Sequence, residues 1–501
     1  MTNANFTAST GKTDRAIVIG GGIAGLLAAK VLSEYYNEVL IVDRDAFPDK
    51  PENRPGTPQA YHNHRLSPRG SLIFSRYFPG FIDDLLTNGA PSAQGESNLM
   101  IHQDGSKVLV GQGKEAKFSR ALLEWVIRKQ VQVIPHIQFL EKKDVLSLQT
   151  SPDRTAVTGV LIQERGATDR LKHTLTADLV VDTSGRFSKT VRWLTEVGYD
   201  VPKPELLKVA LGYSTRQYKV PSGQKLPWDV IRLEGVPSTG AYSGVFSTIE
   251  NNIAEMLLWN VGGRYPSTDI DQFEREIAHL DNPVFVETLK ELEPISTPRG
   301  YRMPELVRQH FDKMERWPSG FLVMGDAFCY FDPIYGQGMT VAAIEAEVLD
   351  ACLRDQVERP KSGFELSVLK KMQNAIEPAW WLNCVADLRC PGVEHAGSVP
   401  LKGVEFAQRC LGFILKQAMA QPNDDLYGLY WLVNSVFVHP RELFNPQMLT
   451  ALANSSPEGQ QLVVELTKGF NVSLEERFAQ EIPSFENASF ASIDQLMMPQ
   501  E

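Results

Sequence analysis

Residues 15–43 read RAIVIGGGIAGLLAAKVLSEYYNEVLIVD, and this stretch decides the fold. Its apolar runs at 15–19 and 38–43 predict two strands, and residues 26–36 predict the helix between them. The first strand passes into the helix through a turn with the spacing Gly20-x-Gly22-x-x-Gly25. A strand, a glycine turn, a helix and a second strand in this order are typical of a dinucleotide-binding βαβ unit.

Each glycine of this turn has its own expected role in holding a dinucleotide. Gly20 makes the turn, Gly22 lets the backbone approach a pyrophosphate, and Gly25 lets the helix pack on the strand. The free N–H groups at the helix N-terminus, around Ala24, attract the phosphate anion. Asp43, 18 residues beyond Gly25, is expected to accept hydrogen bonds from ribose hydroxyls. An ordinary glycine turn in an α/β sheet is the alternative.

A second segment, GDAFCYFDPIYGQGMT at residues 325–340, favours FAD over NAD. Asp326 follows a buried strand-like run, where a carboxylate can bind a ribityl hydroxyl, a group that NAD lacks. The glycine-rich turn at 333–338 opens a long helix, whose N–H groups and dipole suit the negative charge of a reduced flavin ring. The two segments together predict FAD as the cofactor. Taken alone, Asp326 fits a helix N-cap or a buried salt bridge equally well.

The size and composition of the chain indicate a globular protein of several domains. Its 501 residues predict two to four domains. With 43% hydrophobic and 22% charged residues, it is neither disordered, collagen-like nor a coiled coil. Fifty Lys and Arg against 61 Asp and Glu leave a net charge of −11, so we expect no nucleic-acid partner. No apolar run reaches about 18 residues, which predicts no transmembrane segment.

The cysteines and the N-terminus favour a cytoplasmic location. The five cysteines are odd in number and form no CxxC pair, which predicts neither a zinc site nor a disulfide framework. The first residues, MTNANFTASTGKTD, lack the charged-then-apolar order of a signal peptide. We therefore expect a cytoplasmic protein without a bound metal.

The order of the segments predicts an α/β protein with a Rossmann-type FAD-binding domain, interrupted by an antiparallel β-sheet substrate domain and followed by a helical C-terminal region. Short strand-like runs between Pro and Gly turns at 205–265 predict the antiparallel sheet. A helix at 124–130 and a strand VQVIP at 131–135 are expected upstream. The predicted boundaries are 1–78, 112–204 and 297–375 for the FAD-binding domain, 79–111 and 205–296 for the substrate domain, and 376–501 for the helical cap.

Three ordered motifs resemble the fingerprints of FAD-dependent group A monooxygenases, the p-hydroxybenzoate hydroxylase type. They are GGGIAG with VD, DLVVDTSGR at 178–186, and the segment at 325–340, and the resemblance covers about residues 15–375. It implies that Arg120 contacts the flavin and that Asp326 binds the ribityl chain. The family's middle fingerprint ends in Asp-Gly, whereas this chain has Asp182-Thr-Ser-Gly185. The cofactor residues implied in this way are Gly20, Gly22, Ala24, Gly25, Asp43, Arg44, Arg120, Asp182, Gly185, Asp326, Pro333, Gly336, Gly338 and Met339.

Further motifs resemble a narrower group, the polyether-pathway epoxidases of the lasalocid and monensin type. These are DRDAFP at 43–48, RPGTPQAYHNHRL at 54–66, CYFDPIYGQGMT at 329–340 and AWWLNCVADLRCP at 379–391. The chain departs from this pattern at Asp332, where an Asn is expected. The resemblance implies alkene epoxidation in natural-product biosynthesis, with a polyene or polyketide as the substrate.

The implied chemistry is transfer of one oxygen atom from a flavin C4a-hydroperoxide to an apolar substrate. FAD, O₂ and an electron donor are required, either NADPH or NADH, or a separate flavin reductase. No second dinucleotide fold is visible, so we expect nicotinamide to bind transiently. Epoxidation needs no residue to activate the substrate, whereas phenol hydroxylation would want a general base, and the sequence shows none. An aromatic hydroxylase, a flavin-dependent halogenase and a reductase of the same fold remain as alternatives, although the WxWxIP stretch of halogenases is missing.

Other residues near these motifs have weaker functional signals. His62 and His64 form an HxH pair without a third ligand nearby, so a role in the pocket is favoured over a metal site. Tyr335, in the glycine-rich turn, is a further pocket candidate. Trp380 and Trp381 are more typical of core than of a channel. The apolar helices after Pro360 are expected to pack on the other domains, with an elongated apolar cavity between the layers.

Overall fold

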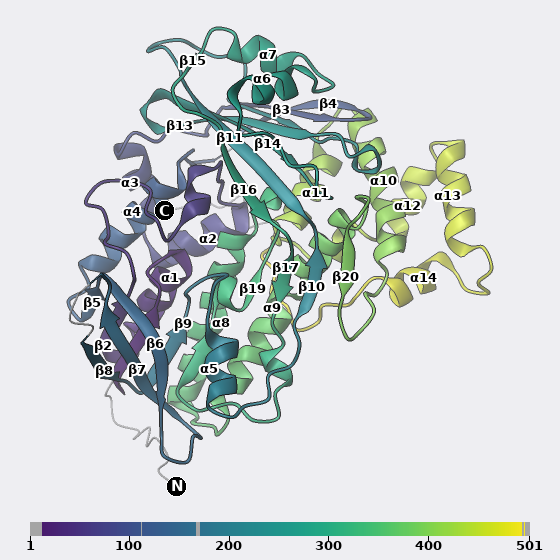
Figure 1. Cartoon of the computed structure of the whole chain (residues 1–501). Coiled ribbons are helices and arrows are strands. Elements are labelled where there is room, and N and C mark those ends of the chain that lie inside the picture. The colour runs from purple at the N-terminus through teal and green to yellow at the C-terminus, as the bar shows by residue number, and fades with distance from the viewer. Residues whose placement is uncertain (1–12, 112, 167–170, 493–494, 496–501) are drawn as a thin grey trace.

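A five-stranded parallel sheet forms the base of the molecule in the computed structural model, which describes residues 13–111, 113–166, 171–492 and 495 (Figure 1). The strand order is β18-β9-β1-β2-β5, with all neighbours parallel. The strands are β1 (Thr13–Ile19), β2 (Tyr36–Val42), β5 (Ile137–Leu140), β9 (Leu179–Asp182) and β18 (Phe321–Val323). The predicted strand, glycine turn, helix and strand are confirmed, with α1 at Ile23–Leu32.

Helices cover the faces of this sheet and bury its apolar side chains. α1 packs on α4 (Arg120–Gln132) and on α8 (Gly338–Glu358), and α8 in turn packs on α9 (Phe364–Asp387). The strand expected at 131–135 is wrong, because Leu123, Ile127 and Val131 recur at helical spacing and are all buried along α4. α4 therefore continues to Gln132, and the next strand, β5, begins only at Ile137.

A long, mainly antiparallel sheet lies above the parallel sheet in Figure 1. Its order is β15-β11-β14-β13-β12-β3-β4, and β16 also pairs with β11. The strands are β3 (Ser97–His102), β4 (Gly105–Val110), β11 (Leu211–Lys219), β12 (Val230–Leu233), β13 (Ser243–Ile249), β14 (Ile253–Asn260), β15 (Glu293–Pro294) and β16 (Arg299–Met303). This confirms the predicted antiparallel sheet inserted into the α/β fold.

The two faces of this sheet have different neighbours. Residues such as Phe246, Met256 and Leu258 pack in a separate core with α6 (Ile270–Ala278) and α7 (Val284–Leu289). Because side chains alternate along a strand, the residues between them, such as Val245 and Leu257, face the opposite way. That second face looks toward the parallel sheet, and it forms part of a cavity.

Two smaller sheets and a set of helices complete the fold. The sheets are β6-β7-β8, at Lys143–Thr150, Val157–Glu164 and Lys172–Thr176, and β19-β17-β10-β20, at Cys329–Tyr330, Leu306–Arg308, Glu205–Lys208 and Glu394–Ala396. The remaining helices are α2 (Pro68–Tyr77), α3 (Phe81–Thr87), α5 (Thr190–Glu196), α10 (Val404–Ala420), α11 (Asp425–Asn434), α12 (Pro446–Ala453), α13 (Pro457–Thr467) and α14 (Leu474–Glu481). Helices α10 and α12–α14 lie to the right in Figure 1.

One expected boundary, at 296, falls between two strands of the same sheet, and another, at 375, falls inside a helix. β16 pairs with β11 over Leu211–Thr215, so the antiparallel sheet continues past residue 296 to Met303. α9 runs without interruption from Phe364 to Asp387, so residues 375 and 376 belong to one helix. Its Trp380 and Trp381 are buried in the core, as their pattern predicted. The boundaries at residues 1, 112 and 501 lie outside the described residues.

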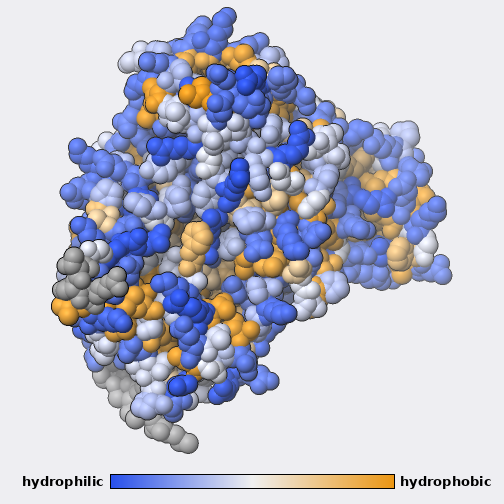
Figure 2. All heavy atoms as spheres, in the orientation of Figure 1, coloured by the Kyte–Doolittle hydropathy of each residue, from blue (hydrophilic) through white to orange (hydrophobic). Residues whose placement is uncertain are grey.

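The surface is mainly polar. On the face in Figure 2, hydrophilic residues predominate and hydrophobic residues form separate groups. Within the described residues, no helix has both the length and the apolar content that a bilayer crossing requires.

Candidate functional site

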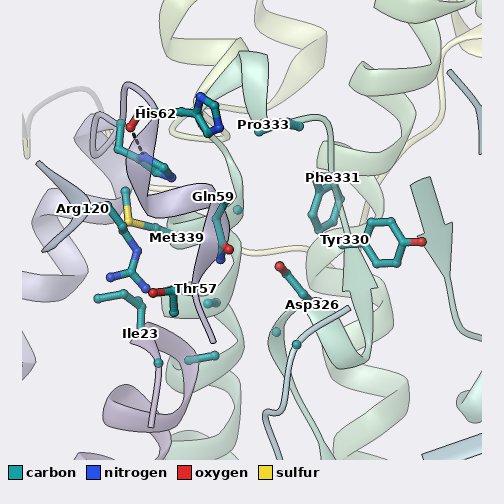
Figure 3. A pocket seen from close by; sticks show the side chains of 18 of the residues that line it. Ile23, Thr57, Gln59, His62, Arg120, Asp326, Tyr330, Phe331, Pro333 and Met339 are labelled. Atoms are coloured by element: carbon teal, nitrogen blue, oxygen red, sulfur yellow. Dashed lines mark hydrogen bonds between the residues drawn. The ribbon is translucent and has the colours of Figure 1, made fainter. Parts of the chain in front are cut away.

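A cavity of about 640 Å³ extends from the glycine turn after β1 to the free face of the antiparallel sheet. This volume lies within the range of small-molecule and cofactor sites. The predicted cofactor residues that line it are Gly20, Gly22, Ala24, Asp43, Arg44, Arg120, Gly185, Asp326, Pro333, Gly336, Gly338 and Met339. The structure thus brings together motifs that are 300 residues apart in the sequence, as Figure 3 shows for the residues it labels.

The glycine turn fits a pyrophosphate. Gly20 has φ +98°, which favours glycine, and a Cβ at Gly25 would lie 1.9 Å from the Gly20 carbonyl oxygen. Gly25 therefore lies behind the cavity wall, where it allows α1 to approach β1. A Cβ at Gly22, in contrast, would meet only Arg54 Nη2, at 3.8 Å, so the backbone is open to the cavity there. No side chain caps α1 at Gly22, which leaves its first N–H groups for an anion.

Asp43 at the end of β2 is already engaged by its own chain. Its Oδ2 accepts a hydrogen bond from the Gly21 N–H at 2.7 Å, and its Oδ1 accepts one from the Asp45 N–H at 2.8 Å. Arg54 Nη1 lies 3.3 Å from Oδ1. The same Arg54 nitrogen lies 3.4 Å from Oδ2, so each oxygen of Asp43 already accepts two hydrogen bonds. A carboxylate has about four acceptor positions, so a ribose hydroxyl would have to replace the long contacts of Arg54. Arg44, beside it, is exposed at the cavity rim.

A buried ion-pair cluster holds Arg120 at the cavity. Glu124 accepts from Arg54 Nε at 2.7 Å and from Arg120 Nη1 at 2.9 Å. All three side chains are nearly inaccessible to solvent. The sequence predicted Arg120 but did not single out Arg54, which opens the RPGTPQAYHNHRL motif at 54–66. Only the fold brings Arg54 to Asp43 and Glu124.

Asp326 presents a carboxylate to the cavity. It follows β18, in a turn where Gly325 has φ +64° and the Gly325 N–H donates to Glu345. Figure 3 shows Asp326 pointing into the space opposite Gln59. Within the described part of the chain, no group donates a hydrogen bond to this carboxylate. The side chain is exposed to the open cavity, and desolvation by the surrounding protein raises its pKa to about 6, against the opposing charges of Arg120 and Arg186.

The turn at 333–336 is held from behind by two helices. Asp332 caps it by accepting from the Ile334 N–H, and Gly336 takes the left-handed conformation with φ +67°. The Tyr335 hydroxyl donates to Asp387 Oδ1 on α9 at 2.8 Å. The Gln337 side chain donates to the Asn434 carbonyl of α11. Tyr335 therefore lines the cavity, and its hydroxyl is hydrogen-bonded to α9.

His62 and His64 both line the cavity but have different partners. His62 Nδ1 is 2.8 Å from Thr215 Oγ1 on β11, and its ring packs edge-on against Tyr213. His64 donates from Nδ1 to the His62 carbonyl. Burial lowers the pKa of His62 to about 3 and that of His64 to about 4, so both are neutral at pH 7. Among the residues that the structure describes, no three His, Cys, Asp or Glu form a metal-binding group.

Asp182 does not line the cavity. Its carboxylate accepts from the Ser184 N–H and from the hydroxyls of Ser188 and Thr190, at 2.6–2.9 Å. It organises the loop after β9, whereas the backbone of that loop, at Gly185, reaches the cavity wall. The motif thus contributes through its loop and not through this acid.

The other half of the cavity is mainly apolar. It is formed by the free face of the antiparallel sheet, by the loop before α4 and by the end of α11. Its apolar side chains include Met100, Leu109, Phe118, Val230, Val245, Ile249, Leu257, Trp259, Met303, Trp431 and Leu432. α11 therefore supplies one wall of the cavity, whereas the buried Trp380 and Trp381 of α9 do not reach it.

Known proteins share both sequence and fold with the chain. It is 29% identical over 396 residues to Protein Rv3254 of Mycobacterium tuberculosis, which covers 77% of this chain and 82% of that protein. It is 26% identical over 375 residues to the kynurenine 3-monooxygenase of Salinispora arenicola, covering 70% and 74%. Its structure is similar to the flavin-dependent brominase Bmp2, with a TM-score of 0.63 and 14% identity over 89% of this chain and 98% of that one. No family model matches the sequence. The chain therefore has the fold of flavin-dependent monooxygenases and halogenases.

Proposed function

We propose that this protein is an FAD-dependent monooxygenase that adds one oxygen atom to an apolar small molecule. The observation that carries the proposal is the unpaired Asp326 carboxylate, which faces the same cavity as the open Gly22 backbone and the uncapped N-terminus of α1. This donor and acceptor set suits a phosphate at one point and a polyhydroxyl chain at another. The likeness to kynurenine 3-monooxygenase in sequence is a second, independent support.

The cofactor would be held by residues from several elements. The N–H groups at Gly22 and Ala24 would bind the pyrophosphate, Asp43 the ribose and Asp326 the ribityl chain. Arg120 and the turn from Pro333 to Met339 would contact the ring. Bound FAD supplies the oxygen-transfer chemistry, with O₂ as co-substrate and NADPH, NADH or a separate flavin reductase as the electron donor.

The residues of the chain itself would bind the substrate and exclude water. The apolar sheet face and α11 would surround an apolar substrate, and a dry site protects reactive intermediates from side reactions. The low pKa values of His62 and His64 make them weak proton acceptors, and the Tyr335 hydroxyl donates to Asp387. None of these three described residues is therefore suited to act as a general base on the substrate. This lack of an activating base favours epoxidation of an alkene over hydroxylation of a phenol. A polyene or polyketide chain from natural-product biosynthesis is the substrate class that we propose.

Electron delivery is proposed to be transient or external. The five-stranded sheet is the only all-parallel sheet in the described ranges. A second parallel sheet that could bind a nicotinamide dinucleotide is therefore not seen there, and this supports transient or external reduction. A cytoplasmic location is proposed with it, since NAD(P)H is available there.

Halogenation is a second candidate, and the likeness in fold to the brominase Bmp2 favours it. One experiment separates the two. Purified protein with FAD, NADPH, ¹⁸O₂ and a mixture of polyenes is incubated with and without a flavin reductase and with and without bromide. We expect products heavier by one ¹⁸O atom in both bromide conditions. Brominated products with bromide, together with no ¹⁸O-labelled product in either condition, would overturn oxygenation. A protein that purifies without bound flavin would overturn both oxygenation and halogenation.

A further inference from the structure

Arg232 is the one charged side chain among the described residues of the sheet β15-β11-β14-β13-β12-β3-β4 that line the cavity. It lies on β12, opposite Met100 on β3 and Val245 on β13. Val245 is in turn opposite Leu257 on β14, and all three neighbours line the cavity. A guanidinium in an apolar row is costly to bury unless its donors find acceptors.

Two of the three nitrogens of Arg232 have acceptors. Nε donates to Glu234 Oε1 at 2.6 Å, and Nη1 donates to the Ile334 carbonyl oxygen at 3.3 Å. The guanidinium carbon lies 4.9 Å from the Trp259 ring and 5.5 Å from the Trp431 ring, so two indoles flank it. These contacts hold the plane of the guanidinium in a fixed position.

The third nitrogen, Nη2, is buried and has no acceptor among the described residues. Most buried donors in proteins are paired, and an unpaired one costs free energy that a ligand oxygen can recover. Arg232 lines the cavity beside the apolar Met100 and Val245, although the polar Asn98 also lies on this face of β3. Nη2 itself has almost no exposed surface, so the polar end of an apolar ligand would supply the missing acceptor after a small movement of the surrounding side chains. The Ile334 contact places that end beside the turn at 333–335.

We propose that Arg232 binds an acyl oxygen of the substrate, a carboxylate or a carbonyl, at one end of an apolar chain. This rests on the proposed function and narrows its substrate class from an apolar molecule to an acyl-terminated one. Arg232 would act in binding and orientation.

The test compares three probes with the same carbon skeleton but different ends. Calorimetric titration of the FAD-loaded protein with farnesoic acid, methyl farnesoate and farnesene gives three dissociation constants. We expect at least one acyl probe to bind roughly tenfold or more tightly than farnesene, as is typical for a hydrogen bond to a charged group. A preference for the acid alone identifies a carboxylate, and tight binding of both acyl probes identifies a carbonyl.

The double variant R232Q/E234Q tests whether Arg232 is the cause. It removes the cation and its carboxylate partner together, so no uncompensated buried charge remains. We expect the acyl preference to fall below threefold while farnesene binding changes little. Arg264 provides the control, since it stacks on Tyr242 in the same sheet region, donates to the Gly240 carbonyl and does not line the cavity. R264Q should keep the wild-type preference.

Several results would overturn the proposal. They are equal binding of farnesene and both acyl probes by the wild type, no binding of any probe, or an unchanged preference in the double variant. If the double variant does not fold, the comparison of the three probes on the wild-type protein decides alone. Flavin content and NADPH-dependent oxygen uptake, measured on the same sample, distinguish a failure of the Arg232 proposal from a failure of the proposed function. A flavin-loaded, active protein without acyl preference contradicts only the role of Arg232, whereas a protein that cannot hold FAD contradicts the proposed function.

Discussion

Asp332 and Asp387 form a buried pair of carboxyl groups directly behind the turn at 333–336. Burial and mutual repulsion raise the pKa of Asp332 well above its usual range, and burial raises that of Asp387 to about 7. The pair therefore holds a proton at neutral pH. The Tyr335 hydroxyl and the Ile334 N–H each donate to one of the two carboxyls, so the pair supports the cavity wall.

This pair predicts a specific pH dependence of stability. Unfolded Asp titrates near pH 4, so between about pH 4 and 7 the native state binds more protons than the unfolded state. The free energy of unfolding should then fall as the pH rises through this window, by about 1.4 kcal/mol per pH unit for each extra proton. Urea unfolding at pH 5 and pH 7.5 should show a smaller loss in D387N than in the wild type. The exposed-site variant D281N should match the wild type, and equal losses in all three proteins would contradict a shared proton.

Gly22→Val is expected to remove the cofactor without unfolding the protein. A Cβ at Gly22 meets only the end of the Arg54 side chain, at 3.8 Å, so the fold tolerates it, whereas a pyrophosphate would clash. Flavin absorbance should be lost while the circular dichroism spectrum is kept. Gly412→Val, at an open and exposed position of α10, should retain flavin. Flavin retained in the Gly22 variant would contradict the assigned pyrophosphate site.

Gly25→Ala should have the opposite effect, although it lies in the same turn. Its Cβ would lie 1.9 Å from the Gly20 carbonyl oxygen, so α1 must move away from β1. Overpacking of this kind typically costs about 1–3 kcal/mol, and backbone contact should place the cost at the upper end. Urea unfolding measures it directly. A variant as stable as the wild type would show that α1 can shift freely.

Asp326→Ala is expected to weaken FAD binding about ten- to hundredfold. The variant removes a charge-assisted hydrogen bond, typically worth about 1.5–3 kcal/mol. Because no described residue donates to Asp326, the variant breaks no hydrogen bond within the protein, and its stability without cofactor should stay near the wild-type value. Fluorescence titration of the apoprotein with FAD measures the change. A change of less than twofold would mean that Asp326 does not contact the cofactor.

The elements that were predictable are those whose signal is local. The turn at Gly20 and the close packing at Gly25 were predictable because each requires a glycine at a fixed spacing, whereas the approach of a pyrophosphate at Gly22 stays a prediction. The strand expected at 131–135 was wrong because a short apolar run fits a strand or the end of a helix, and packing along α4 decided for the helix.

The residues that sequence reasoning missed depend on distant partners. Arg54 lies in an irregular loop and meets Glu124, 70 residues away, only in the folded chain. Arg232 follows an ordinary strand pattern, and its unpaired donor becomes visible only when α11 and the turn at 333–335 surround it. Asp182 shows the converse, since a strand-end acid in a recognisable motif turns out to bind its own loop.

The link between Gln337 and Asn434 has a consequence for how the molecule comes apart. Gln337 stands at the start of α8, and its side chain donates to a carbonyl near the end of α11, close to 100 residues later. The buried Asn383 of α9 donates to the same Gln337 side chain. If the C-terminal helices detached, the buried amide groups beneath the cavity wall would lose hydrogen-bond partners. The C-terminal part is thus no removable module, and the parallel-sheet part and the α11 wall should unfold together, in a single cooperative transition.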